Sequence, residues 1–133
     1  MIEHATEAAT ETPQQGYTEF LRAEIVGDAR GAVDRMTALA QMSMIDQFEL
    51  ETAEIPVWVP PEFRCEYVIG ARHPTLAMLL DFDVPISFTD VEVSPDAARF
   101  TVSVTARTGG LVSARIEMSR EDGRWLIADS SDV

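Results

Sequence analysis

Among the side chains able to carry out general acid–base chemistry, the candidates in this sequence are Tyr17, Asp46, Tyr67 and His73. A carboxylate or an imidazole can take a proton from a substrate, and a tyrosine hydroxyl can donate a hydrogen bond to the oxyanion that forms. We therefore name Asp46 or His73 as the candidate acid–base group, and Tyr17 or Tyr67 as the candidate oxyanion donor. Because Pro74 follows His73, this histidine could instead only cap a turn at the surface.

Asp81 and Asp83 lie on the same side of an extended segment, close in sequence to His73. They could pair with this histidine, or they could contribute to a site for a hard cation such as calcium. A calcium loop needs more oxygen ligands and a glycine, and one cysteine with two histidines offers no zinc spacing. We therefore expect no metal site, and no motif indicates a cofactor.

These groups belong to a chain of 133 residues, which is enough for one domain. Its 23 acidic residues outnumber 10 basic ones, all of them arginines, and the net charge is −13. Such a surface repels phosphates, so we expect no binding of nucleic acid or of anionic membranes. One cysteine allows no intrachain disulfide, and the polar N-terminus does not resemble a signal peptide, so we expect a cytoplasmic protein. We expect residues 1–13 to form a flexible acidic lead-in and residues 14–133 a single domain.

The first half of the chain has the periodicity of helices. Apolar residues recur at helical spacing between Pro13 and Gly27, and Asp28 is suited to cap a second helix that extends to about Asp46. A third, short helix is predicted over Thr75–Leu80. The apolar face of the first helix carries Tyr17, Phe20, Leu21 and Ile25.

Between these helices, apolar and polar side chains alternate from Phe63 to Ile69, which predicts a β-strand. Cys65 belongs to the apolar side of this strand, so we expect an inert thiol that faces the core.

The second half predicts an antiparallel meander, and the sequence positions of its apolar residues test the pairing. Apolar residues hold even positions up to Phe88 and odd positions from Val91, which predicts a β-bulge near Thr89 and Asp90. The pairs expected around this bulge are Phe88 with Val102, Val91 with Phe100, and Val93 with Ala98.

The next hairpin is predicted to turn through the three residues Thr108, Gly109 and Gly110, with a left-handed glycine. This loop would place Val102 opposite Ile116. A further turn at Glu121-Asp122-Gly123 leads to a last strand from Arg124 to Ala128.

Two groups of residues carry a resemblance to a known family. Phe20-Leu21-Arg22-Ala23 precedes Gly27-Asp28 near the start, and Glu121-Asp122-Gly123-Arg124-Trp125-Leu126-Ile127 lies near the end. With the order of elements between them, these motifs resemble the nuclear-transport-factor-like superfamily, or cystatin-like α+β cone, over about Gln14 to Asp129. The superfamily includes ketosteroid isomerase, scytalone dehydratase and polyketide cyclases. The resemblance implies an α+β fold, with N-terminal helices packed into a curved antiparallel β-sheet cone.

The same resemblance implies where a site would lie. Isomerase members have a tyrosine where this chain has Leu21, and a base near the position of Asp46. Their late-strand acid has no counterpart on the apolar face of this meander. We therefore expect a cone that binds a small apolar ligand without a complete catalytic set, although acid–base chemistry of an isomerase, dehydratase or cyclase stays open. Besides the two tyrosines, the residues expected to line the pocket are Phe20, Met36, Trp58, Phe88, Val102 and Ile116.

The charge pattern supports an alternative function, an acidic protein of the inhibitor or immunity type that binds a basic protein. No basic residue lies between Arg35 and Arg64 or between Arg72 and Arg99, whereas each stretch holds five acids. Such blocks can steer a basic partner, although they could equally form solvated faces. The residues proposed for this contact are Glu49, Glu51, Glu54 and Trp58. We also expect a homodimer through the open face of the sheet, which carries Arg99, Ser103, Arg115 and Glu117.

Overall fold

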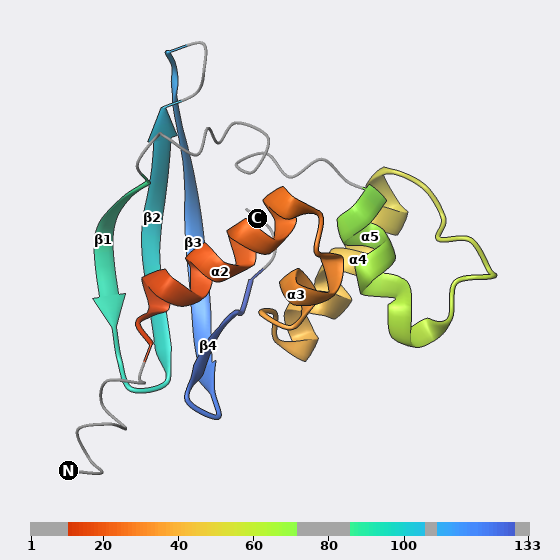
Figure 1. The fold of residues 1–133 in the computed structure, drawn as a ribbon, viewed down its shortest axis with the longest axis horizontal. Coiled ribbons are helices and arrows are strands. Elements are labelled where there is room, and N and C mark those ends of the chain that lie inside the picture. Colours follow the sequence, from red (N-terminus) through yellow and green to blue (C-terminus); the bar gives the residue numbers. More distant parts are fainter. Residues whose placement is uncertain (1–10, 72–85, 106–108, 130–133) are drawn as a thin grey trace.

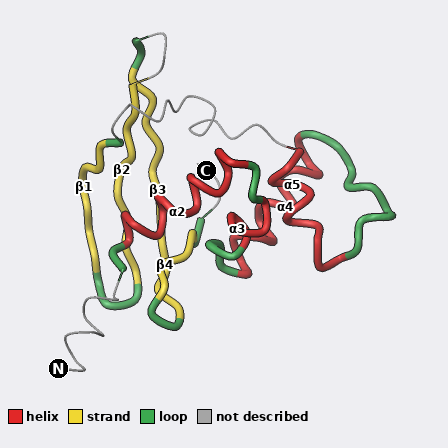
Figure 2. Tube along the Cα trace, viewed as in Figure 1, coloured by secondary structure: helices red, strands yellow, loops and turns green. Residues whose placement is uncertain are grey.

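The computed structural model describes residues 11–71, 86–105 and 109–129. Helices form the first part of the chain and an antiparallel sheet the second, so the fold is α+β as predicted (Figure 1). Figure 2 shows the helices gathered beside the sheet, with one helix in front of it. The helix predicted over Thr75–Leu80 and the candidate residues His73, Asp81 and Asp83 lie outside the described residues.

Helix α2 (Pro13–Val26) confirms the first predicted helix. The Thr12 hydroxyl accepts a hydrogen bond from the backbone N–H of Gln15, and the Gln15 side chain accepts one from the Thr12 N–H. This reciprocal cap uses two backbone donors that the first turn leaves without a helical partner. At the other end Gly27 adopts a φ of 80°, a left-handed conformation that closes helices at little steric cost.

The second predicted helix is wrong, because two helices occupy its place: α3 (Ala29–Val33) and α4 (Ala38–Glu51). Between them the carbonyl of Arg35 accepts a hydrogen bond from Ile127 (2.7 Å), and the N–H of Thr37 donates one to Ile127 (2.9 Å). This bridge to the last strand uses backbone groups that a continuous helix would need for itself. A tertiary contact therefore overrides the local helical periodicity.

The strand predicted from Phe63 to Ile69 is also wrong. A 3₁₀ turn, η1 (Pro61–Phe63), leads into helix α5 (Arg64–Ala71). The buried residues of α5 are Cys65, Val68 and Ile69, whose spacing fits one face of a helix as well as the alternation fits a strand. Pro61 stands at the first position of the 3₁₀ turn, where the missing N–H costs nothing. Cys65 is buried, as predicted.

The sheet consists of β1 (Ser87–Val93), β2 (Ala97–Thr105), β3 (Leu111–Glu121) and β4 (Arg124–Ile127), in that order. Its last strand ends one residue before the predicted Ala128.

The predicted β-bulge is confirmed, because the register of β1 against β2 shifts between Thr89 and Glu92. Asp90 adopts a φ of 52° within the bulge. The bulge leaves Asp90 and Val91 together opposite Phe100, the residue with which Val91 is predicted to pair. The pairs Phe88–Val102 and Val93–Ala98 are confirmed.

The predicted register of β2 against β3 is wrong by two residues, because Val102 pairs with Ala114 and not with Ile116. Alternation requires only that apolar side chains face one another, and two registers that differ by two residues both satisfy this. The observed register places Phe100 opposite Ile116, and both side chains are fully buried. Gly109 adopts a φ of 91°, the left-handed conformation expected of a hairpin glycine.

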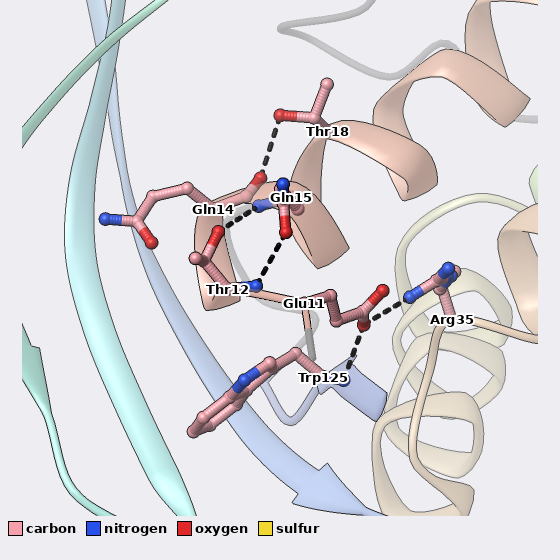
Figure 3. A network of polar contacts seen from close by, with 7 residues as sticks. All are labelled: Glu11, Thr12, Gln14, Gln15, Thr18, Arg35 and Trp125. Carbon is pink, nitrogen blue, oxygen red and sulfur yellow. Dashed lines mark hydrogen bonds and ion pairs between the residues drawn. The ribbon is translucent and has the colours of Figure 1, made fainter. Parts of the chain in front are cut away.

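Glu11 connects three parts of the fold (Figure 3). One carboxylate oxygen, Oε1, accepts hydrogen bonds from Arg35 Nη1 (2.6 Å) and from the backbone N–H of Trp125 (2.8 Å). Glu11 and Thr12, which the sequence analysis places in the lead-in, therefore take part in the contacts of the folded domain.

The core lies between α2 and the sheet face that carries Phe100, Val102, Ile116 and Met118. Helix α2 approaches β4 so closely that a Cβ at Gly16 would lie 2.7 Å from the carbonyl oxygen of Trp125. Among the described residues, no helix has the length and apolar character required to cross a lipid bilayer.

Candidate functional site

The residues predicted to line a pocket divide between two places. Tyr17 and Phe20 on α2 contact side chains of the sheet in the core. Between ring centroids, Tyr17 lies 6.5 Å from Phe20, 6.5 Å from Phe88 and 6.0 Å from Phe100. The contacts with Phe88 and Phe100 are edge-to-face, the favourable geometry for aromatic pairs. Phe20, Val102 and Ile116 are fully buried around this group, whereas Phe88 at the β1 edge is only half-buried.

We call Tyr17, Phe20, Phe88 and Phe100 the Tyr17 wall. Tyr17 is its polar residue, and the side chain is only 1% exposed. Burial raises the pKa of Tyr17 well above its usual value, and the negative charge of Glu24 raises it further. The phenol therefore keeps its proton, and a protonated phenol can donate a hydrogen bond.

Glu24 is a candidate that the sequence analysis did not identify. It lies seven residues after Tyr17, two helical turns along the same face of α2, and its Oε2 atom is buried. The i, i+7 spacing from Tyr17 was the available signal, but a single acid in a helix rich in Glu and Gln does not stand out.

Asp46 and Tyr67, the other candidate catalytic residues within the described ranges, do not gather around Tyr17. Asp46 lies exposed on α4, on the side opposite the buried Met44. Tyr67 on α5 contacts a separate aromatic group, at 6.4 Å from Phe48 and 6.2 Å from Trp58 between ring centroids. Leu21, at the position where isomerases have a tyrosine, is buried and has no group that can donate a hydrogen bond.

Met36 and Trp58 differ in their placement, because Met36 belongs to the same buried core as Tyr17. Met36 is buried at the bridge to Ile127, where α3 gives way to α4. Trp58 stands in the loop between α4 and η1, and its side chain is largely exposed. Of the residues predicted to line a pocket, those of α2 and the sheet together with Met36 therefore belong to one core, whereas Trp58 is exposed outside it.

Away from Tyr17, residues that the structure describes line two surface hollows. One, of about 550 Å³, lies at the β1–β2 turn between residues such as Val93, Ala98 and Met118. The other, of about 320 Å³, lies between α2 and α3 and is lined by acids together with Arg22 and Arg35. Within the described ranges, no group of three or more His, Cys, Asp or Glu side chains could hold a metal ion.

The outer face of the sheet, predicted as a dimer contact, is polar and internally connected. Glu92 lies 3.2 Å from Arg99 and 3.7 Å from Arg115, and the hydroxyls of Ser103 and Ser113 are 2.9 Å apart. Glu117 is exposed beside them. Dimer formation through this face stays a prediction.

The acids predicted to bind a partner lie around the end of α4. Glu49 accepts a hydrogen bond from Arg64 at 2.9 Å, and Glu51 accepts one from Gln47 at 3.2 Å. Glu54 is exposed in the loop that follows.

The sequence matches no protein-family model and no curated protein. Among solved structures, it is similar to a chain from Campylobacter jejuni described as an NTF2-like transpeptidase. The two share 13% sequence identity with a TM-score of 0.55, and the match covers 89% of this chain and 98% of the other. At this identity the likeness shows the fold alone, and that fold is the nuclear-transport-factor-like one that the sequence analysis predicts.

Proposed function

We propose that this NTF2-like domain binds a small apolar molecule that carries one carbonyl or hydroxyl oxygen. The carrying observation is the buried phenol of Tyr17 within the aromatic group of Phe20, Phe88 and Phe100. Sites for small molecules combine apolar walls with a few polar groups that fix orientation. Here the wall supplies contact area, and the neutral Tyr17 hydroxyl supplies the oriented donor.

The entry for such a ligand is proposed at the β1 edge of the wall. Phe88 and Ile86 are only partly buried there, whereas Phe100 and Val102 behind them are fully buried. We propose that the Phe88 ring, which packs edge-to-face against Tyr17, rotates to admit the ligand.

Binding is a better proposal than isomerase-type catalysis for this chain. Leu21 stands at the position of the isomerase tyrosine, and Asp46 lies on the outer surface of α4, away from Tyr17. Asp46 and Tyr17 therefore cannot act together on one substrate as base and donor.

The test is ligand binding measured by thermal shift and calorimetry with a steroid enone, a sesquiterpene alcohol and an anthraquinone. At least one should raise the melting temperature, and Tyr17→Phe should weaken its binding about 2- to 10-fold, the usual value of one hydrogen bond. Tyr67→Phe is the matched control, because Tyr67 belongs to the other aromatic group. If no probe binds, or if the two variants weaken binding equally, the proposal fails.

A further inference from the structure

The hollow of about 320 Å³ between α2 and α3 brings charged side chains from three elements together. Four lining residues of α2 recur at i, i+3, i+4 and i+7, which places them on one side of the helix: Glu19, Arg22, Ala23 and Val26. The others come from α3, from the residues that flank it and from the first position of β4: Asp28, Gly31, Asp34, Arg35 and Arg124. We call these residues the α2–α3 hollow. Its volume is at the lower end of the range of sites that bind small molecules.

The α2–α3 hollow contains both signs of charge, three arginines and three acids, and four of these groups have a partner. Glu19 and Arg22 form an exposed ion pair at 3.5 Å. The carboxylate of Asp28 caps α3, and the guanidinium of Arg35 pairs with Glu11, which does not line the hollow. These four groups therefore have their charge or hydrogen-bonding capacity at least partly used.

Arg124 and Asp34 are different. Both are exposed, and among the residues that the structure describes neither side chain forms an ion pair or a hydrogen bond. They line the same hollow without pairing with each other. The hollow therefore offers one guanidinium and one carboxylate to a bound molecule.

This mixture of charges restricts the class of ligand. A simple anion at the arginines would also meet three carboxylates, and a simple cation at the acids would also meet three guanidinium groups. A zwitterion avoids both repulsions, because its carboxylate can face Arg124 while its ammonium group faces Asp34. Beside these charges, Ala23 and Val26 supply an apolar strip, and the Val26 side chain is 66% exposed. An aliphatic group of the ligand would remove this apolar surface from water.

We propose that the α2–α3 hollow binds an aliphatic α-amino acid. Its carboxylate accepts two parallel hydrogen bonds from Arg124, the geometry that a guanidinium favours. Its ammonium group donates to Asp34, and its side chain packs against Ala23 and Val26. This proposal does not depend on a ligand at Tyr17.

The probe is L-leucine, titrated into the full chain labelled with ¹⁵N and followed by the backbone amide signals in solution NMR. The signals of Val26, Asp34 and Arg124 should shift with a Kd on the order of 1 mM, as expected of two charged hydrogen bonds and a small apolar contact. Two analogues each remove one charge, since 4-methylpentanoate lacks the ammonium group and isoamylamine lacks the carboxylate. Each should bind about 10-fold more weakly than leucine. If 4-methylpentanoate or isoamylamine binds as tightly as leucine, or if about 20 mM leucine shifts none of these signals, the proposal is overturned.

Two variants assign the charged contacts. Arg124→Gln and Asp34→Asn should each weaken leucine binding about 5- to 20-fold, because each removes one charged partner. In Asp34→Asn, leucine should also lose its advantage over 4-methylpentanoate, and in Arg124→Gln its advantage over isoamylamine. Arg99→Gln and Asp96→Asn are the matched controls, because they make the same changes of charge at exposed positions of the β1–β2 hairpin. The proposal fails if the controls weaken leucine binding equally, since the net charge would then explain the effect.

Discussion

The side chain of Tyr17 combines two properties that rarely occur together, deep burial and an ionisable group. Its ring packs against Phe88 and Phe100, while its hydroxyl lies in the field of Glu24. Both burial and the nearby negative charge disfavour the phenolate, so the residue keeps its proton over a wide range of pH.

This raised pKa predicts a loss of stability at alkaline pH. In the unfolded chain the phenol ionises near its ordinary pKa of about 10, whereas the folded protein holds the proton to higher pH. Above pH 10 the folded state therefore binds more protons than the unfolded state, and the free energy of unfolding falls as the pH rises. Tyr17→Phe should flatten the dependence of the urea midpoint on pH between 9 and 11.5. Parallel profiles for the variant and the wild type would contradict this assignment.

At the scale of elements, the contacts of Glu11 hold the helices and the sheet together. They connect the start of α2, the segment between α3 and α4, and strand β4. Glu11 contacts both Arg35 and the backbone of Trp125, and the side chains of Glu11 and Arg35 are mostly buried. Removal of this carboxylate would leave a partly buried guanidinium and a backbone N–H without this acceptor.

We expect Glu11→Ala to lower the free energy of unfolding by about 1–3 kcal/mol, measured by urea denaturation. Glu19→Ala serves as the control, because the pair of Glu19 with Arg22 is largely exposed and contributes little. An equal loss of unfolding free energy in both variants would show that the contacts of Glu11 stabilise the fold no more than an exposed ion pair does.

The elements also show what the sequence can and cannot predict. The end of α2 at Gly27 and the β-bulge depend on local residue types and on parity, so both were predictable from the sequence. The break before α4 depends on Ile127, which lies about ninety positions away, and the register of β2 against β3 depends on which large side chains meet. The α5 error has a different cause, since eight residues can satisfy two periodicities at once.

The candidate site was predictable to a similar degree. Tyr17, Phe20 and Val102 could be identified because helical and strand periodicity place them on inward faces. Asp46 was a candidate because isomerase members have a base near this position. Helix α4 places its side chain on the exposed side instead. The position of Trp58 depends on a proline-rich loop, for which neither periodicity applies.

On the scale of the whole molecule, the dominant feature is the net charge of −13. Within one domain, charges of one sign repel each other more in the compact state than in the expanded one. We expect the melting temperature to rise by about 2–5 °C between 10 and 150 mM NaCl, because salt screens this repulsion. Choline chloride should give the same increase, and an unchanged melting temperature would show that local ion pairs offset the repulsion.

The bulge in β1 has a consequence for the behaviour of the protein at high concentration. In the described sheet β1 is an outer strand, and an outer strand offers free backbone groups onto which another chain can add. Asp90, with its positive φ, interrupts the regular backbone there, and the charged side chain of Glu92 follows it. A foreign strand could therefore not extend along β1 in register, and we expect this irregularity to disfavour edge-to-edge aggregation.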